Sequence, residues 1–317
     1  MDANSPFVDF LLPTDRVIGL EIDGEYLAVP HNILWWHEIA NFDDLGLAVT
    51  YCPLTGSSMV FHRGNAEDAQ FAVSGLLFKN NLVMFDRNVL LSDDNGKGIR
   101  RDETLWPQML AGGFCGPLEG RGLAMYPSIE IEWEDWVALH PDTRVVSNQT
   151  GFGQNYQLYP YGSYERLDNT QTLDVISDPD ERRPAKERVL GMLSRSGRGV
   201  AFPFGALRDA AVDGLTVVHT ALGDDLGQGD VDPVVVFWDS EAASAMAFNP
   251  SIPTRDLTFE VRNDAFVDVE TGSLWSIDGR ALSGPLEGEQ LLSIADAYVS
   301  FWFAFSEMFP NPVLWLP

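Results

Sequence analysis

Cys52 is the residue whose type and position most clearly suggest chemistry. It follows an expected strand at residues 48–51 and precedes a Pro-Leu-Thr-Gly turn, so its side chain should lie at a strand end. A thiol becomes a nucleophile when a neighbour lowers its pKa, and an imidazole is the usual activating partner. His37 and His62 are the available bases, so we expect Cys52 in a partly accessible pocket beside one of them. The alternative is a buried structural thiol, because free cysteine is among the most buried residue types.

His37 stands next to Glu38 and could serve as a base whose ring is held by that carboxylate, or as a metal ligand. The alternative is a surface histidine at a helix end, beside a glutamate in a salt bridge. Neither His-x-x-x-His nor Cys-x-x-Cys occurs, so a zinc site built from local sequence is not expected. Cys52, His37 and Met84 would form a soft site suited to a transition metal such as copper, if the fold brings them together.

Five further residues could bind a small-molecule ligand in the same pocket. They are Tyr51, Ser74, Asn80, Asp86 and Arg87. The alternative for Ser74 and Asn80 is a role in turns, because serine and asparagine side chains readily bond to nearby backbone. Asp86 has a carboxylate counterpart later in the chain, and this repetition favours a structural role such as capping a turn.

The candidate residues lie in the first of two similar halves. Arg-Val-Ile-Gly at residues 16–19 recurs as Arg-Val-Leu-Gly at 188–191, and Gly-Pro-Leu-Glu-Gly at 116–120 recurs letter for letter at 284–288. Self-similarity of this kind indicates a repeated structural unit, so we predict a tandem duplication. The predicted divisions are an N-terminal segment (1–15), a first module (16–149), a connecting segment (150–187) and a second module (188–317).

Each half should consist mainly of antiparallel strands. Asp23-Gly24 suits the tight turn of a hairpin, and Pro30 favours the start of a short helix, as does Pro203. Apolar residues at helical spacing predict a closing amphipathic helix over 129–140 in the first half and 297–308 in the second. The expected fold class is α+β, mainly antiparallel β, with two pseudo-symmetric repeats. The expected strands are 48–51, 59–62, 70–74, 82–85, 234–237, 245–248 and 257–261.

The two halves differ in their titratable residues. Four of the five histidines precede residue 150, and Asp239 occupies the position in the second half that matches Cys52. When one copy of a duplicated unit keeps a site, the other becomes scaffold, so we expect the site in the first module. The connecting segment carries four tyrosines among turn-forming residues, which is typical of a linker or a functional cover.

The chain is strongly acidic, with 47 Asp and Glu residues against 20 Lys and Arg and a formal net charge of −27. Such a surface repels a phosphate backbone, so nucleic acid is not an expected partner. Three of the basic residues are lysine and the others arginine, a balance that fits a salt-adapted surface, because salt screens self-repulsion. The alternative is an ordinary acidic protein. Cys52 and Cys115 lie in different motifs, so we expect two free thiols.

No stretch approaches the roughly 18 apolar residues that a membrane helix needs, so we expect a soluble protein without a membrane span. The first residues show neither the basic region nor the apolar core of an export signal. We expect a cytoplasmic protein if Met1 is the native start, and an exported one if the chain is a trimmed mature form. The sequence does not indicate an oligomeric state.

Several motifs occur in a specific order along the chain. They are Trp-His-Glu-Ile at 36–39, Tyr-Cys-Pro-Leu-Thr-Gly at 51–56, Met-Phe-Asp-Arg at 84–87, His-Pro-Asp-Thr at 140–143 and Pro-Ala-Lys-Glu-Arg-Val-Leu-Gly at 184–191. Over nearly its whole length the chain resembles the prokaryotic family called domain of unknown function 3179. The resemblance implies no established activity, and members often begin with an export or lipoprotein signal. Many members have Cys-Pro-Leu-Cys where this chain has Thr55 in the last position, so a two-thiol redox mechanism is not expected here.

These observations predict an enzyme that acts on a small molecule or depends on a metal, with Cys52 and His37 in a pocket of the first module. One alternative is a non-catalytic ligand- or metal-binding module, whose pocket would lack the pair of thiol and base. Another is a salt-adapted assembly protein without a site, which would show exposed apolar patches and no pocket.

Overall fold

The computed structural model describes residues 1–87, 91–92, 98–99, 103–176, 178–223 and 232–317. Within these residues the chain forms mostly antiparallel sheets and four short α-helices, which confirms the predicted α+β, mainly antiparallel class. None of the described helices has the length and apolar character needed to cross a membrane.

A four-stranded sheet organises the first half of the chain. Its strands, in spatial order, are β11 (Ile129–Glu132), β1 (Arg16–Ile22), β2 (Glu25–Pro30) and β12 (Arg144–Val145). β1 and β2 form the hairpin predicted around Asp23-Gly24, and both turn residues have the positive φ that this hairpin turn requires. β12 runs parallel to β2, whereas the other two pairs are antiparallel.

Two helices accompany this sheet. α1 (His31–His37) begins directly after Pro30, as predicted, and α2 (Trp133–Leu139) follows β11. The predicted closing helix began too early, because Ile129 to Glu132 pair with β1 and are therefore strand. β1 must approach α2 closely: a Cβ added at Gly19 would lie 2.5 Å from the Trp136 ring.

A second four-stranded sheet has the same order and the same strand directions. Its strands are β24 (Tyr298–Phe301), β13 (Arg188–Leu193), β14 (Gly199–Pro203) and β25 (Val313–Leu314). α3 (Phe204–Asp209) follows Pro203 as predicted, and α4 (Trp302–Met308) follows β24. Here too the start of the predicted closing helix is strand, because residues 298–301 pair with β13.

Smaller antiparallel sheets complete the two halves, and each of the seven predicted strands overlaps one of their strands. In the first half they are β3 (Ile39–Phe42), β4 (Leu47–Cys52), β5 (Ser57–His62), β6 (Gln70–Phe78), β7 (Asn81–Arg87), β8 (Leu91–Ser92), β9 (Gly98–Ile99) and β10 (Leu105–Pro107). In the second half they are β15 (Leu215–Leu222), β16 (Asp232–Asp239), β17 (Ser244–Phe248), β18 (Ser251–Ile252), β19 (Arg255–Asp256), β20 (Phe259–Val261), β21 (Phe266–Asp268), β22 (Leu274–Trp275) and β23 (Ala281–Ser283). Short 3-10 turns lie at Pro6–Val8, Gly64–Ala66 and Gln108–Leu110.

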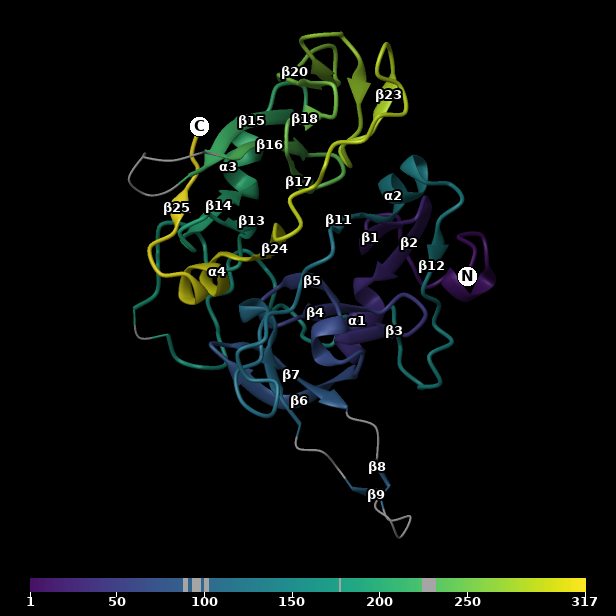
Figure 1. Ribbon diagram of the computed structural model, residues 1–317, viewed down its shortest axis with the longest axis vertical. Coiled ribbons are helices and arrows are strands. Elements are labelled where there is room, and N and C mark those ends of the chain that lie inside the picture. The colour runs from purple at the N-terminus through teal and green to yellow at the C-terminus, as the bar shows by residue number, and fades with distance from the viewer. Residues whose placement is uncertain (88–90, 93–97, 100–102, 177, 224–231) are drawn as a thin grey trace.

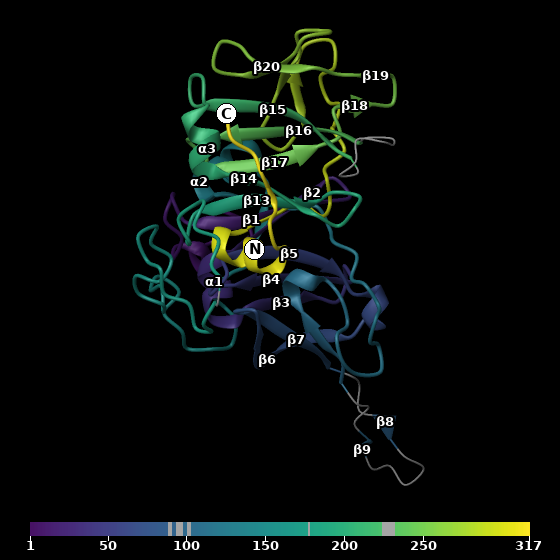
Figure 2. The same cartoon turned by 90° about the vertical axis from the view of Figure 1, so that its left-hand side faces the viewer.

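The two halves share their hydrophobic core. One cluster of buried side chains joins Trp136 of the first half to Phe237 of the second, and another joins Cys52 to Phe301 and Trp302. Strand β11 also contacts β17, and β5 contacts β24. Figures 1 and 2 show the result, with β1 and β13 near the middle, β3–β7 towards one end and β15–β23 towards the other. Residues of the second half therefore help to enclose the candidate thiol of the first.

Candidate functional site

Cys52 is the last residue of β4, and its side chain is 1% exposed. The turn that follows it is fixed to the second half, because the Phe301 amide donates a hydrogen bond to the Thr55 carbonyl at 2.8 Å. Burial raises the pKa of the Cys52 thiol. The prediction of a partly accessible thiol with a lowered pKa is therefore wrong for this structure. The physical reason is the packing of β24 over the turn, which the sequence of the first half does not reveal.

The two predicted histidine bases have their described contacts elsewhere. His37 Nε2 lies 2.7 Å from the Tyr156 hydroxyl, in the connecting segment, and burial lowers the pKa of this imidazole. The His62 ring packs edge-on against Tyr126, with ring centroids 5.2 Å apart. Met84, by contrast, belongs to the same core cluster as Cys52. In the described part of the chain no group of three or more His, Cys, Asp or Glu side chains could hold a metal, and the copper site stays a prediction.

Three of the predicted ligand-binding residues have distinct surroundings. Tyr51 is fully buried, and its ring lies 4.2 Å from that of His31. Asp86 Oδ1 accepts the backbone amide of Thr104 at 2.6 Å, the capping role that was the structural alternative for this carboxylate. Arg87 is exposed at the end of β7. Of these three residues, Asp86 has a capping role, Arg87 is exposed, and Tyr51 is buried directly before Cys52 in β4.

Ser74 and Asn80 make the backbone contacts expected of turn residues. The Ser74 hydroxyl donates to the Val83 carbonyl at 2.5 Å, across the hairpin formed by β6 and β7. Asn80 has a positive φ of 62°, and its side-chain oxygen accepts the Asp174 amide at 2.7 Å. Asn80 therefore ties the hairpin to the connecting segment.

Lys186 is the residue that the sequence prediction missed. Its side chain is buried, with Nζ 3.5 Å from the centre of the Tyr164 ring and 4.3 Å from that of Phe303. Among the described residues Nζ has no hydrogen-bond partner. Burial lowers the pKa of Lys186 to about 7, and the nearby Cys52 thiolate acts in the opposite direction. The sequence offered one signal for this residue: lysine is rare in the chain, and Lys186 is one of only three.

The backbone explains how Lys186 reaches the first half. The amides of Trp302 and Phe303 donate to the carbonyls of Glu187 and Ala185, at 2.7 and 3.0 Å. The residue before them, Phe301, bonds to the turn after Cys52, so one short segment holds both the thiol turn and the lysine. The Lys186 amine therefore sits at the junction between the two halves and the connecting segment.

Glu38 adds a carboxyl group to the same neighbourhood. It follows α1 as the C-cap residue with a positive φ of 59°, a conformation that costs a non-glycine residue about 1 kcal/mol or more. Its carbonyl accepts the Tyr51 amide at 2.8 Å, so Glu38 lies opposite the end of β4. Burial raises the pKa of Glu38 to about 7, and its charge in turn raises the pKa of Cys52.

Tyrosines of the connecting segment cover this group. The Tyr164 hydroxyl donates to the Leu54 carbonyl at 3.0 Å, two residues after the thiol. Burial, followed by the charges of Glu38 and Cys52, raises the pKa of Tyr161 to about 12. Both phenols therefore remain protonated at neutral pH. The segment acts as a cover over the turn rather than as a free linker.

A second buried network lies beside Tyr51 and joins the halves. Glu130 Oε1 accepts bonds from Arg188 at 2.7 Å and from Arg16 at 3.4 Å, and Oε2 accepts one from Ser58 at 2.6 Å. Burial alone would raise the pKa of Glu130, but the neighbouring charges and the Ser58 hydrogen bond outweigh it and lower the pKa to about 2. His31, 3.5 Å from Oε2, is neutral because burial lowers its pKa to about 3.

The chemistry of the site follows from these groups. A thiol, a primary amine with a pKa near 7, a carboxyl group with a pKa near 7 and protonated phenols surround one buried turn. Perturbed pKa values of this kind cluster at functional sites. The set can supply a nucleophile together with proton carriers that are poised near neutral pH. We refer to Cys52, Lys186, Glu38, Tyr161 and Tyr164 as the thiol–amine site.

Searches of curated proteins and of solved structures each found no match to the chain. Residues 3–312 match the family described as Protein of unknown function (DUF3179), which is nearly the whole chain. The description names no activity, so the function has to be argued from the site. The match confirms the resemblance seen in the sequence motifs, and the chain belongs to this family.

Proposed function

We propose that the protein is an enzyme that acts on a small molecule through covalent attack by the Cys52 sulfur, with Lys186 accepting the thiol proton. The observation that carries the proposal is a buried Lys186 amine, without a hydrogen-bond partner among the described residues, that packs on the same Phe301 ring as the buried Cys52 cluster and interacts with the charge of that thiol. Burial of an ammonium group without a hydrogen-bond partner is unfavourable, and the rings of Tyr164, Phe301 and Phe303 offset only part of this cost, since burial still lowers the pKa of Lys186. A fold that keeps the amine in this position is best explained by a function that uses it.

The substrate class we infer is a small molecule with an electrophilic acyl carbon, such as an ester or thioester. The Cys52 sulfur forms a bond to that carbon while the thiol proton passes to the neutral Lys186 amine and the carbonyl electrons move to oxygen. The leaving group then departs with the proton of the Lys186 ammonium. Water finally attacks the acyl carbon, the acid is released, and the thiol regains its proton.

The pKa directions support this division of roles. Burial raises the pKa of Cys52, so the thiol is protonated at neutral pH and needs a base. A proton carrier works best when its pKa lies near the operating pH, and burial brings the pKa of both Lys186 and Glu38 to about 7. Glu38 is then the second carrier, which accepts a proton from the attacking water and returns it to the departing thiolate.

Access to the thiol requires movement of the cover. Cys52 is 1% exposed, and Tyr164 bonds directly to the turn that follows it. We propose that the part of the connecting segment around Tyr161 and Tyr164 moves aside when substrate enters and closes over it afterwards. Closure would exclude water from the acyl intermediate until the leaving group has departed.

Acylation by p-nitrophenyl acetate tests the proposal. In a Cys115→Ser background, which removes the exposed thiol, intact and peptide mass spectrometry should find one acetyl group, on the peptide that contains Cys52. The Cys52→Ser variant in the same background should remain unmodified, and its circular dichroism spectrum will show that it is folded even though a hydroxyl buried in this core cluster lowers its melting temperature. Acetylation of Cys52 only after denaturation would overturn the proposal, because a thiol closed throughout the native state cannot act on a substrate.

We further propose that the two halves descend from one duplicated unit, with the first module (16–149) contributing the thiol and the second (188–317) serving as scaffold. The shared order of the two four-stranded sheets supports this origin. So does a repeated cap: Asp268 Oδ2 accepts the Ser273 amide at 3.0 Å, as Asp86 accepts Thr104 in the first half. Lys186, Tyr161 and Tyr164, all in the connecting segment, would be the residues that the site draws from outside the first module.

A further inference from the structure

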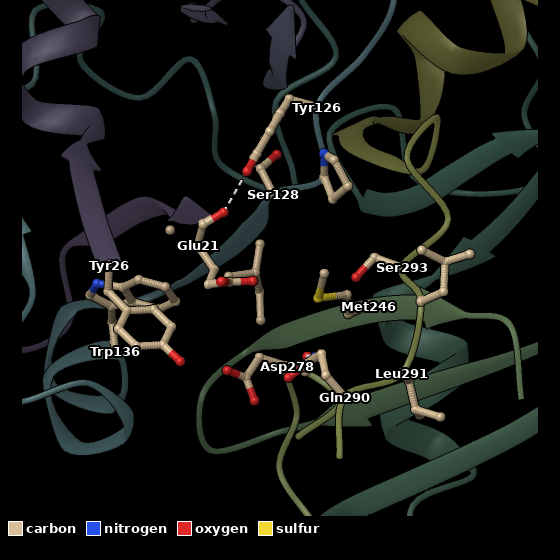
Figure 3. Close-up of a pocket in the computed structure, with 14 residues that line it drawn as sticks. Glu21, Tyr26, Tyr126, Ser128, Trp136, Met246, Asp278, Gln290, Leu291 and Ser293 are labelled. Atoms are coloured by element: carbon tan, nitrogen blue, oxygen red, sulfur yellow. Dashed lines mark hydrogen bonds between the residues drawn. The ribbon is translucent and has the colours of Figure 1, made fainter. Parts of the chain in front are cut away.

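A cavity lies between the two halves, and none of its lining residues belongs to the thiol–amine site. Its volume is about 350 Å³, within the range of small-molecule pockets. The first half contributes residues of β1, β2 and α2 together with residues 126–129, and the second half contributes Met246, Asp278 and residues 290–293. Figure 3 shows Glu21 and Tyr26 facing Met246, Ser293, Asp278 and Gln290 across this space. A ligand here would touch both halves at once.

One part of the wall is aromatic and firmly held. The Tyr26 ring stacks on His140 with centroids 3.6 Å apart, and its hydroxyl accepts a hydrogen bond from Arg280 Nη1 at 2.7 Å. Trp136 lies behind it, edge-on to the same tyrosine. The Tyr126 hydroxyl donates to the Glu21 carbonyl at 2.6 Å, which fixes a second ring next to Glu21. These rings offer apolar contact area that needs no rearrangement before a ligand binds.

The polar part of the wall consists mainly of hydrogen-bond acceptors. Asp278 is held by His140 Nε2 at 2.9 Å and by the Ser276 hydroxyl, and these bonds lower the pKa of Asp278 against the effect of burial. Gln290 donates its amide nitrogen to the Asp278 carbonyl at 2.8 Å, which leaves the Gln290 side-chain oxygen as an acceptor. Glu21 adds a carboxylate, and Ser128 and Ser293 add hydroxyls. Within the described residues that line the cavity there is neither lysine nor arginine.

We infer that this cavity binds a neutral, hydroxyl-rich ring compound, a mono- or disaccharide. The carboxylates of Glu21 and Asp278 repel anions, which excludes phosphorylated and acidic compounds. They accept hydrogen bonds from O–H donors, and the tyrosine rings suit the C–H faces of a sugar ring. Arg280 at the rim, bonded to Tyr26, partly offsets the acidic charge, so an uncharged ligand fits better than an organic cation. The site is independent of the thiol–amine site, and neither proposal depends on the other.

The test is ligand-observed NMR with maltose, cellobiose and lactose as neutral probes, and with spermidine and glucuronate as cationic and anionic comparators. At least one neutral disaccharide should give saturable binding to the wild-type chain. Glu21→Gln removes one charged acceptor, so it should weaken that binding about tenfold. Glu119→Gln, at an exposed position remote from the cavity, should leave the affinity unchanged.

Three outcomes would overturn the inference. They are binding of none of the neutral sugars, tighter binding of spermidine than of any sugar, and equal sugar binding by the wild type and the Glu21→Gln variant. Because Glu21 is exposed on β1, the variant should fold, and its melting temperature will show whether it does. A second variant, Ser293→Ala, removes a hydroxyl from the opposite wall and should weaken binding of the same sugar.

Discussion

Lys186 should destabilise the folded protein whenever its amine is protonated. Burial lowers its pKa from 10.5 to about 7, so between these values the unfolded chain binds more protons than the folded one. Stability then rises with pH across this window, because ∂ΔG/∂pH follows the excess of protons on the unfolded state. Replacement of the lysine should remove that trend.

We therefore expect Lys186→Met to raise the melting temperature more at pH 6 than at pH 10, as measured by thermal unfolding monitored by circular dichroism. Lys79→Met is the matched control, because the Lys79 amine has a backbone acceptor, the Glu307 carbonyl at 2.7 Å. It should lower the melting temperature or leave it unchanged. A Lys186→Met variant that melts earlier than wild type at pH 6 would show that the amine stabilises the fold.

Neutralising Glu130 should lower the free energy of unfolding more than neutralising any other single carboxylate. Glu130→Gln removes the buried carboxylate that partly buried Arg16 and Arg188 share and leaves Arg188 with only the longer of its described carboxylate contacts, the one to Glu165, so it should lower the free energy of unfolding by about 3–5 kcal/mol. Glu119→Gln, at an exposed position, should change it by less than about 0.5 kcal/mol. Chemical denaturation at neutral pH measures both changes. Equal midpoints for the two variants would mean that the buried network contributes no stability.

The same network predicts how acid unfolds the protein. The pKa of Glu130 is depressed in the folded state, so its stabilising contribution is present above its unfolded value near 4.5 and is lost as pH falls towards 2. The pKa of His31 is lowered from 6.5 to about 3, so the unfolded chain takes up a proton first and stability already falls below pH 6.5. Both effects lower the free energy of unfolding as pH falls, so they should add.

The sequence indicated the thiol but not its partners. Cys52 was identifiable because its strand and turn are local features. Lys186 was not, because it follows Cys52 by more than a hundred residues and reaches it through backbone bonds to Trp302 and Phe303. His37 was a reasonable candidate by type, yet it ends α1 and bonds to Tyr156. The partners of a buried group are set by long-range packing, which a single sequence does not encode in a readable pattern.

At the scale of elements, the contact between β1 and α2 depends on glycine. A Cβ at Gly19 would lie 2.5 Å from the Trp136 ring, so Gly19→Ala should force the helix outward and cost about 1–3 kcal/mol. Gly64→Ala is the control, because nothing lies within 4 Å of a Cβ there and no positive φ is required. Thermal unfolding of the two variants makes the comparison. Similar melting temperatures would show that α2 does not pack against β1 as described.

The elements that followed local rules were predicted well. The Asp23-Gly24 hairpin and the helices after Pro30 and Pro203 depend on backbone preferences of one or two residues. The closing helices were predicted too long because Ile129 and Phe301 continue the helical spacing of the apolar residues that follow them, yet residues 129–132 and 298–301 pair with β1 and β13. Sheet pairing overrode the local pattern at these two places.

At the scale of the whole molecule, the net charge of −27 should make stability depend on salt. The screening length falls from about 10 Å at 0.1 M salt to about 3 Å at 1 M, which weakens repulsion among surface carboxylates. We expect the melting temperature to rise between low salt and molar KCl, as measured by scanning calorimetry. A flat or falling melting temperature would count against a salt-adapted surface.

The candidate site depends on how the two halves and the connecting segment pack together. Cys52 comes from the first half, the rings of Phe301 and Phe303 from the second, and Lys186 from the segment between them. A site assembled from three parts of the chain exists only when all three are in place. This is why the packing of the halves, rather than any local motif, decides what the thiol can do.

The pH dependence of Cys52 alkylation by iodoacetamide tests most directly whether Lys186 accepts the proton of Cys52. In a Cys115→Ser background the rate should follow a titration with a midpoint near 7, the value to which burial brings the pKa of Lys186. Adding Lys186→Met should slow the reaction at neutral pH by about a hundredfold, the usual minimum for loss of a general base. The remaining reaction should then follow the raised pKa of the thiol itself. Two superimposable pH profiles would contradict the account.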